Sequence, residues 1–209
     1  LRCNLRCGHC GSDCTASPDC QDMPAEDFFS VLDRQITPRV DPHRVMVVLS
    51  GGEVLQQPAF AARILRGAKD MGIHTALDTS GFLGRNASDE LLADVDLVLL
   101  DVKAGDEATH ARVTGRPLAP TLEFGRRLSA LGIETWIRFV LVPGLTDDPA
   151  TVDGVARYAA SLPAVARVEV LPFHQMGRDK WAALGLDYAL ADTAPPTQAA
   201  VEEACAAFR

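Results

Sequence analysis

Three cysteines near the start of the chain have a spacing suited to holding a small inorganic centre. Cys3, Cys7 and Cys10 follow the pattern C-x3-C-x2-C. Three thiolates in so short a loop can surround one centre, because the loop directs all three sulfurs inward. With three protein ligands, a cluster of four irons keeps one iron open for another ligand, unlike the four-thiolate centre of an electron-transfer ferredoxin. The spacing therefore favours an iron–sulfur centre with an open coordination position.

Two other roles for these thiols stay open. A disulfide framework is disfavoured, because the first residues contain no apolar signal segment and the rest of the chain has the pattern of an intracellular α/β protein. Structural zinc is the second alternative, with Cys14 or His9 as a fourth ligand. Zinc ligands usually come as two closely spaced pairs separated by a longer spacer, and only one such pair is present here. We interpret Cys14 and Cys20 as incidental thiols.

The composition is that of an ordinary globular protein. The 209 residues are 47% hydrophobic and 23% charged, values that exclude a disordered or low-complexity chain. Lys and Arg total 20 against 28 Asp and Glu, and the formal charge of −8 argues against a nucleic-acid partner. Apolar runs such as Val45–Leu49 are strand-sized, far below the roughly 18 residues of a membrane span. We therefore expect no nucleic-acid or membrane partner. We also expect a cytoplasmic monomer.

Short apolar runs alternate with segments of helical period along the chain. The runs predict strands at Val45–Ser50, His74–Asp78, Leu97–Val102, Thr135–Val142 and Arg167–Phe173. The segments between and after them predict helices at Pro24–Ile36, Pro58–Met71, Leu122–Leu131, Pro149–Leu162 and Pro196–Arg209. Nearly continuous apolar strands separated by helices are typical of a parallel sheet covered by helices, or of a partial barrel. No linker or repeat divides the chain, so we predict one domain spanning residues 1–209.

Glycines and charged residues occur where the predicted strands end. The first strand is followed by Gly51, Gly52 and Glu53, and paired glycines let the backbone approach a ligand closely. Further polar residues lie in or directly after the later strands: Asp78, Thr79, Asp101, Lys103, Arg138 and His174. Ligands of parallel α/β folds gather at the carboxyl ends of the strands. We therefore expect these residues to share one edge of the sheet and to bind a ligand there.

Each of these residues also has a purely structural interpretation. A charged side chain buried in a strand needs a partner, so Asp78, Asp101, Lys103 and Arg138 could form one structural ion-pair network. In the functional interpretation, Lys103 and Arg138 contact the carboxylate of a cofactor or an acidic substrate segment, while the two aspartates could flank a small cation. The glycine pair could be a simple turn, and His174 a capped loop histidine.

The cysteine motif resembles the signature of the radical SAM superfamily, C-x3-C-x-(aromatic)-C, with His9 at the aromatic position. The resemblance implies a 4Fe-4S cluster held by the three cysteines, with its open iron chelated by the amino and carboxylate groups of S-adenosylmethionine. It also implies that the GGE motif at positions 51–53 holds the methionine amino group.

Four longer segments are similar to pyruvate formate-lyase activating enzymes, a family of glycyl radical enzyme activases. These segments are Gly72–Phe82, Leu97–Lys103, Thr135–Asp148 and Glu169–Trp181. The resemblance runs from Cys3 to about Pro196. It implies reductive cleavage of S-adenosylmethionine to a 5′-deoxyadenosyl radical, which removes an α-hydrogen from a glycine of a pyruvate formate-lyase type partner. It further implies a flavodoxin- or ferredoxin-type reductant and a position for His174 near the cofactor or the substrate peptide. The cation near Asp78 and Asp101 would be monovalent.

The chain departs from this family at its start. Members carry a strand before the first cysteine, whereas only Leu1 and Arg2 precede Cys3 here. We therefore expect a partial (β/α)6-type TIM barrel of parallel strands lacking its first strand, in an N-terminally truncated radical SAM domain. Gly11-Ser12 also replaces the His-Asn that such activases often carry, and Cys205 is interpreted as a core residue of the last helix. The alternatives are another small radical SAM enzyme, or a non-catalytic zinc or iron–sulfur binding module.

Overall fold

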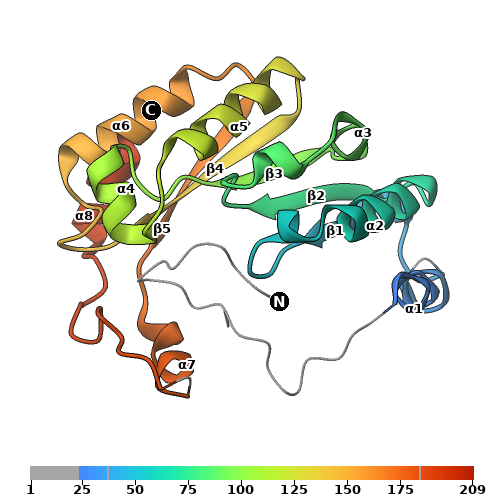
Figure 1. The fold of residues 1–209 in the computed structure, drawn as a ribbon, viewed down its shortest axis with the longest axis horizontal. Helices are drawn as coiled ribbons and strands as arrows, with labels where there is room; N and C mark the ends of the chain where they lie inside the picture. The colour runs from blue at the N-terminus through green and yellow to red at the C-terminus, as the bar shows by residue number, and fades with distance from the viewer. Residues whose placement is uncertain (1–23, 37, 184) are drawn as a thin grey trace.

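The computed structural model describes residues 24–36, 38–183 and 185–209. The predicted cluster ligands Cys3, Cys7 and Cys10, together with His9, Cys14 and Cys20, lie outside these residues. Five strands form one sheet in the order β1-β2-β3-β4-β5, and every neighbouring pair is parallel (Figure 1). The strands are β1 (Met46–Leu49), β2 (His74–Thr79), β3 (Leu97–Asp101), β4 (Glu134–Leu141) and β5 (Val165–Pro172). The predicted parallel α/β architecture is confirmed.

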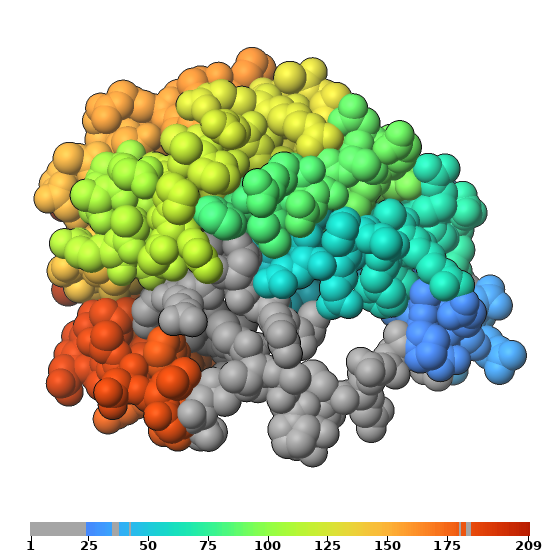
Figure 2. Space-filling view, in the orientation of Figure 1, coloured from blue at the N-terminus to red at the C-terminus, as the bar shows by residue number. Residues whose placement is uncertain are grey.

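Helices precede, connect and follow the strands. The α-helices are α1 (Ala25–Val31), α2 (Pro58–Asp70), α3 (Asp89–Leu92), α4 (Glu107–Thr114), α5 (Ala119–Ala130), α6 (Pro149–Ala160), α7 (Arg178–Ala183) and α8 (Gln198–Ala206). A π-helical turn at Leu32–Ile36 extends α1, and 3-10 turns lie at Pro42–Arg44, Val54–Gln56, Gly84–Asn86 and Gln175–Gly177. The helix α1 lies at one end of the molecule beside α2, and α7 lies at the other end (Figure 2).

Most predicted helix boundaries agree with the structure because capping residues mark them. Asp148 accepts a hydrogen bond from the Ala150 amide at 2.9 Å and begins α6, as its position before Pro149 predicts. Helix α5 begins three residues earlier than predicted, at Ala119, because Pro120 occupies its first turn with a fixed φ. Pro24 was expected inside its helix and instead lies at the N-cap of α1.

Two features of the helices differ from the sequence-based expectation. Helices α3, α4 and α7 were not predicted; the N-cap of α4 is Asp106, whose carboxylate accepts a hydrogen bond from the Thr109 amide at 2.8 Å. In α8, Ala204 is buried while Cys205 is only half-buried, so the prediction of Cys205 as a core residue is wrong. Val201 and Ala204 of α8, and Phe208 just after this helix, pack against the main core.

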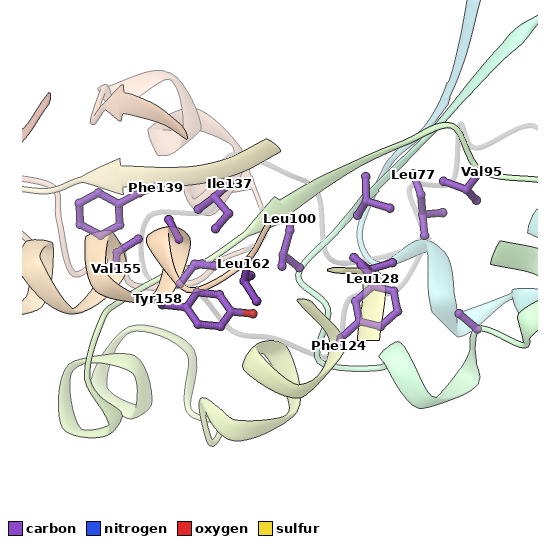
Figure 3. Close-up of a cluster of buried hydrophobic side chains, with 14 of the residues drawn as sticks. Leu77, Val95, Leu100, Phe124, Leu128, Ile137, Phe139, Val155, Tyr158 and Leu162 are labelled. Atoms are coloured by element: carbon purple, nitrogen blue, oxygen red, sulfur yellow. The ribbon is translucent and has the colours of Figure 1, made fainter. Parts of the chain in front are cut away.

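The main hydrophobic core lies on one face of the sheet. Along β4, alternate residues such as Ile137 and Phe139 are fully buried, whereas Trp136 and Arg138 on the other face are only half-buried. Figure 3 shows strand residues of this core together with helix residues such as Phe124 of α5 and Tyr158 of α6. One face of the sheet therefore holds the main core, and the face that carries Trp136 and Arg138 is partly accessible along β4.

Close backbone contact between the loop before α4 and helix α6 depends on glycine. A Cβ added to Gly154 would lie 2.5 Å from the carbonyl oxygen of Gly105, a backbone atom that cannot rotate away. A Cβ on Gly67 of α2 would instead meet the ring of the half-buried Phe29, which can move. We expect Gly154→Ala to lower the free energy of unfolding by about 2 kcal/mol, the cost of overpacking. The matched helical variant Gly67→Ala should change it by less than about 1 kcal/mol, because improved helix propensity offsets the shift of the ring. Urea-induced unfolding measures both; equal losses would contradict this distinction.

Candidate active site

Four charged side chains form one network at the carboxyl edge of the sheet. Arg138 lies between two aspartates: its Nε donates to Asp101 Oδ1 at 2.9 Å, and its Nη2 donates to Asp78 Oδ1. Lys103 Nζ donates to the other oxygen of Asp101 at 2.7 Å. Ser50 Oγ, directly after β1, donates to Asp78 Oδ2 at 2.7 Å. Residues that are far apart in the sequence thus meet in one row across β1, β2, β3 and β4.

The strand register explains why Arg138 can reach both acids. Asp101 of β3 is the direct partner of Arg138 of β4, and Leu99, which aligns with Asp78 of β2, lies two residues before Asp101 on the same face. Arg138 is therefore a mid-strand residue of β4 that lies level with the end of β3, and its side chain also reaches Asp78 near the end of β2. The predicted gathering of Asp78, Asp101, Lys103 and Arg138 is observed, in the form of the ion-pair network that the sequence left as one alternative.

Burial and charge act against each other in this network. Burial alone would raise the pKa of Asp101, but the positive charges of Lys103 and Arg138 outweigh it and lower this pKa. For Arg138, burial disfavours the charged form, and the two carboxylates overcome this effect and raise its pKa. Asp101 and Arg138 are thus held in their charged forms, and the row pairs two acidic side chains with two basic ones.

The GGE motif lies at the same edge, beyond β1. Gly51 has a φ of +137°, a backbone conformation that strongly favours glycine. Glu53 is 3% exposed, and Thr79, at the end of β2, donates a hydrogen bond to its carboxylate at 2.6 Å. The motif is therefore more than a simple turn, since its acidic residue connects two strand ends.

His174 is not joined to this network by a contact among the described residues. It is exposed, it precedes the 3-10 turn at Gln175–Gly177, and its Nδ1 accepts a hydrogen bond from the Met176 amide at 3.4 Å. This is the capped loop position that the sequence left as the alternative to a binding role.

The sequence reasoning missed His110, a buried titratable residue of α4. Its side chain is 1% exposed, and neither ring nitrogen has a hydrogen-bond partner within the described part of the chain. Burial lowers the pKa of His110, and the neighbouring charges of Glu107, Lys103 and Asp106 partly offset one another. No motif or spacing could have revealed this position, because α4 itself was not predicted.

His110 makes the fold sensitive to mild acid. Because the folded state lowers its pKa, the unfolded chain binds the proton more readily, and stability falls as the pH drops below about 6.5. We expect His110→Leu to be about as stable as the wild type near pH 7.5 and more stable near pH 5. Urea unfolding at the two pH values measures the difference, with His43→Gln, at an exposed histidine, as the control that should keep the wild-type pH dependence. An unchanged pH dependence in His110→Leu would contradict the expectation.

Comparison with known proteins identifies the family of this chain. The sequence profile of the Radical SAM superfamily matches residues 1–153. The pyruvate formate-lyase-activating enzyme of Clostridium pasteurianum is 38% identical over 191 residues, covering 91% of this chain and 79% of that protein. The enzyme of the same name from Staphylococcus aureus strain USA300 is 35% identical over 210 residues, covering 97% of this chain and 83% of that protein. The chain belongs to the radical SAM superfamily, in the family of pyruvate formate-lyase-activating enzymes.

A solved structure supports the same assignment. The crystal structure of a domain of pyruvate-formate lyase-activating enzyme from Bacteroides vulgatus is 25% identical, with a TM-score of 0.64, and covers 78% of this chain and 91% of that domain. The family and fold inferred from the sequence motifs are thereby confirmed. Membership of the superfamily implies a 4Fe-4S cluster and S-adenosylmethionine as cofactors. None of the helices in the described ranges has the length and apolar character that crossing a bilayer demands.

Proposed function

We propose that this chain is an activase that abstracts the α-hydrogen of a glycine in pyruvate formate-lyase or a related glycyl radical enzyme. The observation that carries the proposal is the charge-balanced row of Asp78, Arg138, Asp101 and Lys103 at the carboxyl edge of a radical SAM fold. When bound, the cluster and S-adenosylmethionine supply the one-electron reductive cleavage that generates a hydrogen-abstracting radical. The protein holds the reactants in place and keeps water from the edge.

We assign the cluster to Cys3, Cys7 and Cys10. These residues lie outside the described part of the structure, so the assignment depends on the chemistry of the donor set. Three thiolates suit a 4Fe-4S cluster that needs an open iron, whereas a fourth ligand would close the site. Cys14 and Cys20 have no assigned role, and we treat residues 1–209 as one radical SAM domain.

The residues at the sheet edge fit the charged groups of S-adenosylmethionine. Lys103 and Arg138 are the cationic groups of the row and would receive the methionine carboxylate. The backbone of Gly51 and Gly52 would face the amino group, and Asp78 and Thr79 would complete that side of the site. The methionine part of S-adenosylmethionine carries one ammonium and one carboxylate group, and each of them would meet a side chain of opposite type in this row.

A monovalent cation near Asp78 and Asp101 is a further part of this proposal. All four carboxylate oxygens already accept a hydrogen bond from Arg138, Lys103 or Ser50. A carboxylate oxygen has two lone pairs and can interact with more than one partner. The monovalent cation can therefore bind these oxygens without displacing both Lys103 and Arg138.

Installing a glycyl radical requires two protein partners, a substrate enzyme and an electron donor. We propose a glycyl radical enzyme as the protein substrate, with His174 near its glycine-bearing segment, since this exposed histidine follows β5 at the carboxyl edge. A flavodoxin- or ferredoxin-type protein would supply the electron. We propose a cytoplasmic monomer, which can meet both a protein substrate and a protein electron donor. The net charge of −8 disfavours a nucleic-acid substrate.

Anaerobic reconstitution tests the proposed function. The protein should bind about four irons, and addition of dithionite and S-adenosylmethionine should release 5′-deoxyadenosine. Electron spin resonance on candidate glycyl radical enzymes, incubated with the activated protein, then identifies the substrate by its glycyl radical signal. Tightly bound zinc without iron uptake would favour the non-catalytic module, and cleavage without a radical on any such candidate would favour another small radical SAM enzyme.

A further inference from the structure

The carboxylate of Glu53 is fully occupied by groups of the protein itself. Its Oε1 accepts hydrogen bonds from the Leu55 amide at 3.1 Å and from Thr79 Oγ1 at 2.6 Å. Its Oε2 accepts from the amide and the hydroxyl of Ser80, at 3.1 and 2.5 Å. Each oxygen has two lone pairs, and two donors satisfy each of them. A carboxylate with this set of partners has little capacity left for a ligand.

The same network continues beyond Glu53 into α5. The carbonyl oxygen of Ser80 accepts a hydrogen bond from Thr121 Oγ1 at 2.8 Å, and Thr79 Oγ1 also accepts one from the Gly81 amide at 3.0 Å. Glu53, Thr79, Ser80 and Thr121 are all at most 8% exposed. A continuous series of buried hydrogen bonds therefore connects the loop after β1, the loop after β2 and the first turn of α5.

Turning the Glu53 carboxylate toward a ligand would carry a large penalty. It would leave the amides of Leu55 and Ser80, and the hydroxyl of Thr79, without their acceptor in a buried position. Buried donors that lose their partners destabilise a protein far more than an average hydrogen bond stabilises it. Gly51 and Gly52 directly precede this anchored residue in the chain.

We propose that Glu53 is a positioning residue, which acts with Ser80 and Thr121 to fix the backbone of Gly51 and Gly52 against the end of β2. The proposal rests on the proposed function and refines it. Recognition of the methionine amino group then falls to the backbone of the two glycines, and the Glu53 carboxylate makes no contact with the ligand. Ser80 and Thr121 become determinants of S-adenosylmethionine affinity without touching it.

The test compares variants along the network with a matched buried threonine elsewhere. Thr121→Val removes the link to α5, and Thr121→Ser keeps the hydroxyl. Thr114→Val is the control, because Thr114 is equally buried in α4 and its hydroxyl donates to the backbone carbonyl of His110. Two quantities are measured: the dissociation constant of S-adenosylmethionine from the reconstituted protein, and hydrogen exchange of the amides from Gly51 to Leu55 in protein without the ligand.

We expect Thr121→Val to weaken S-adenosylmethionine binding by about fivefold to tenfold, the value of one lost hydrogen bond. It should also accelerate exchange in the loop from Gly51 to Leu55, and Thr121→Ser should restore both quantities. Ser80→Ala should resemble Thr121→Val. Thr114→Val should leave both quantities unchanged, even where it lowers the overall stability.

Glu53→Gln tests the alternative, in which the Glu53 carboxylate itself binds the ligand. If the carboxylate itself binds the ligand, this variant should lose affinity far more than Ser80→Ala or Thr121→Val while the loop exchanges at the wild-type rate, and the proposal would be wrong. If the proposed function fails, the wild-type protein will not bind S-adenosylmethionine. Faster exchange of the loop in ligand-free Thr121→Val and Ser80→Ala would still support the anchor, and unchanged exchange would overturn it.

Discussion

Replacing Arg138 with alanine is expected to lower the free energy of unfolding by about 3 kcal/mol and to weaken S-adenosylmethionine binding by at least about tenfold. The substitution removes the guanidinium group that lies between the carboxylates of Asp78 and Asp101. Removing one partner of a buried ion pair costs about 3–5 kcal/mol, because the remaining charge is left without compensation. The side chains of Arg138 and Asp101 are both 19% exposed, so residual contact with water places the effect at the lower end.

The pH dependence of this loss identifies its cause. In the wild type the pKa of Asp101 is lowered, so its contribution to stability is present above the unfolded-state value near 4 and is lost as the pH falls through the folded-state value. The difference between the wild type and Arg138→Ala should therefore shrink below about pH 4. Urea unfolding at several pH values measures it.

Two further variants serve as controls for Arg138. Arg138→Lys should recover only part of the stability, because an ammonium group cannot reproduce the planar fork that reaches both aspartates. Arg157→Ala should cost less than about 0.5 kcal/mol, since its i,i+4 pair with Asp153 lies on the surface. If Arg138→Ala unfolds at the wild-type urea concentration, the network contributes no net stability and the argument from charge balance fails.

Replacing Cys7 with alanine is expected to eliminate both iron binding and the cleavage of S-adenosylmethionine. The proposed cluster has three protein thiolates, and the loss of one leaves two ligands for four irons. Iron content after anaerobic reconstitution should fall from about four per chain to background. Release of 5′-deoxyadenosine in the presence of dithionite should fall with it, and Cys3→Ala and Cys10→Ala should behave in the same way.

The nearby thiols provide the matched control for this experiment. Cys20→Ala removes a cysteine from the same N-terminal segment, outside the C-x3-C-x2-C spacing. It should retain the iron and the cleavage activity of the wild type. Equal losses in Cys7→Ala and Cys20→Ala would show that the ligands are chosen wrongly, and zinc in place of iron would remove the basis of the enzyme assignment.

The sequence alone determined the strands, most of the helices and the family. Apolar runs such as Leu97–Val102 are bounded by turns and charged residues, so each strand is predicted to within about two residues at either end. Helices with strong caps, such as α6 after Asp148, were predicted equally well. Helix α4 was missed because it is short and its apolar residues show little helical periodicity.

Only the tertiary structure decided which polar residues interact. The sequence placed Asp78, Asp101, Lys103 and Arg138 near strand ends, but the strand register brings Arg138 between the two acids. The motif at Gly51 and Gly52 predicted a ligand site, whereas the contacts of Glu53 with Thr79 and Ser80 show that its carboxylate is satisfied within the protein. The physical reason is common to both cases. Residue type and spacing fix which groups a strand presents, while hydrogen-bond partners depend on the alignment of strands distant in the sequence.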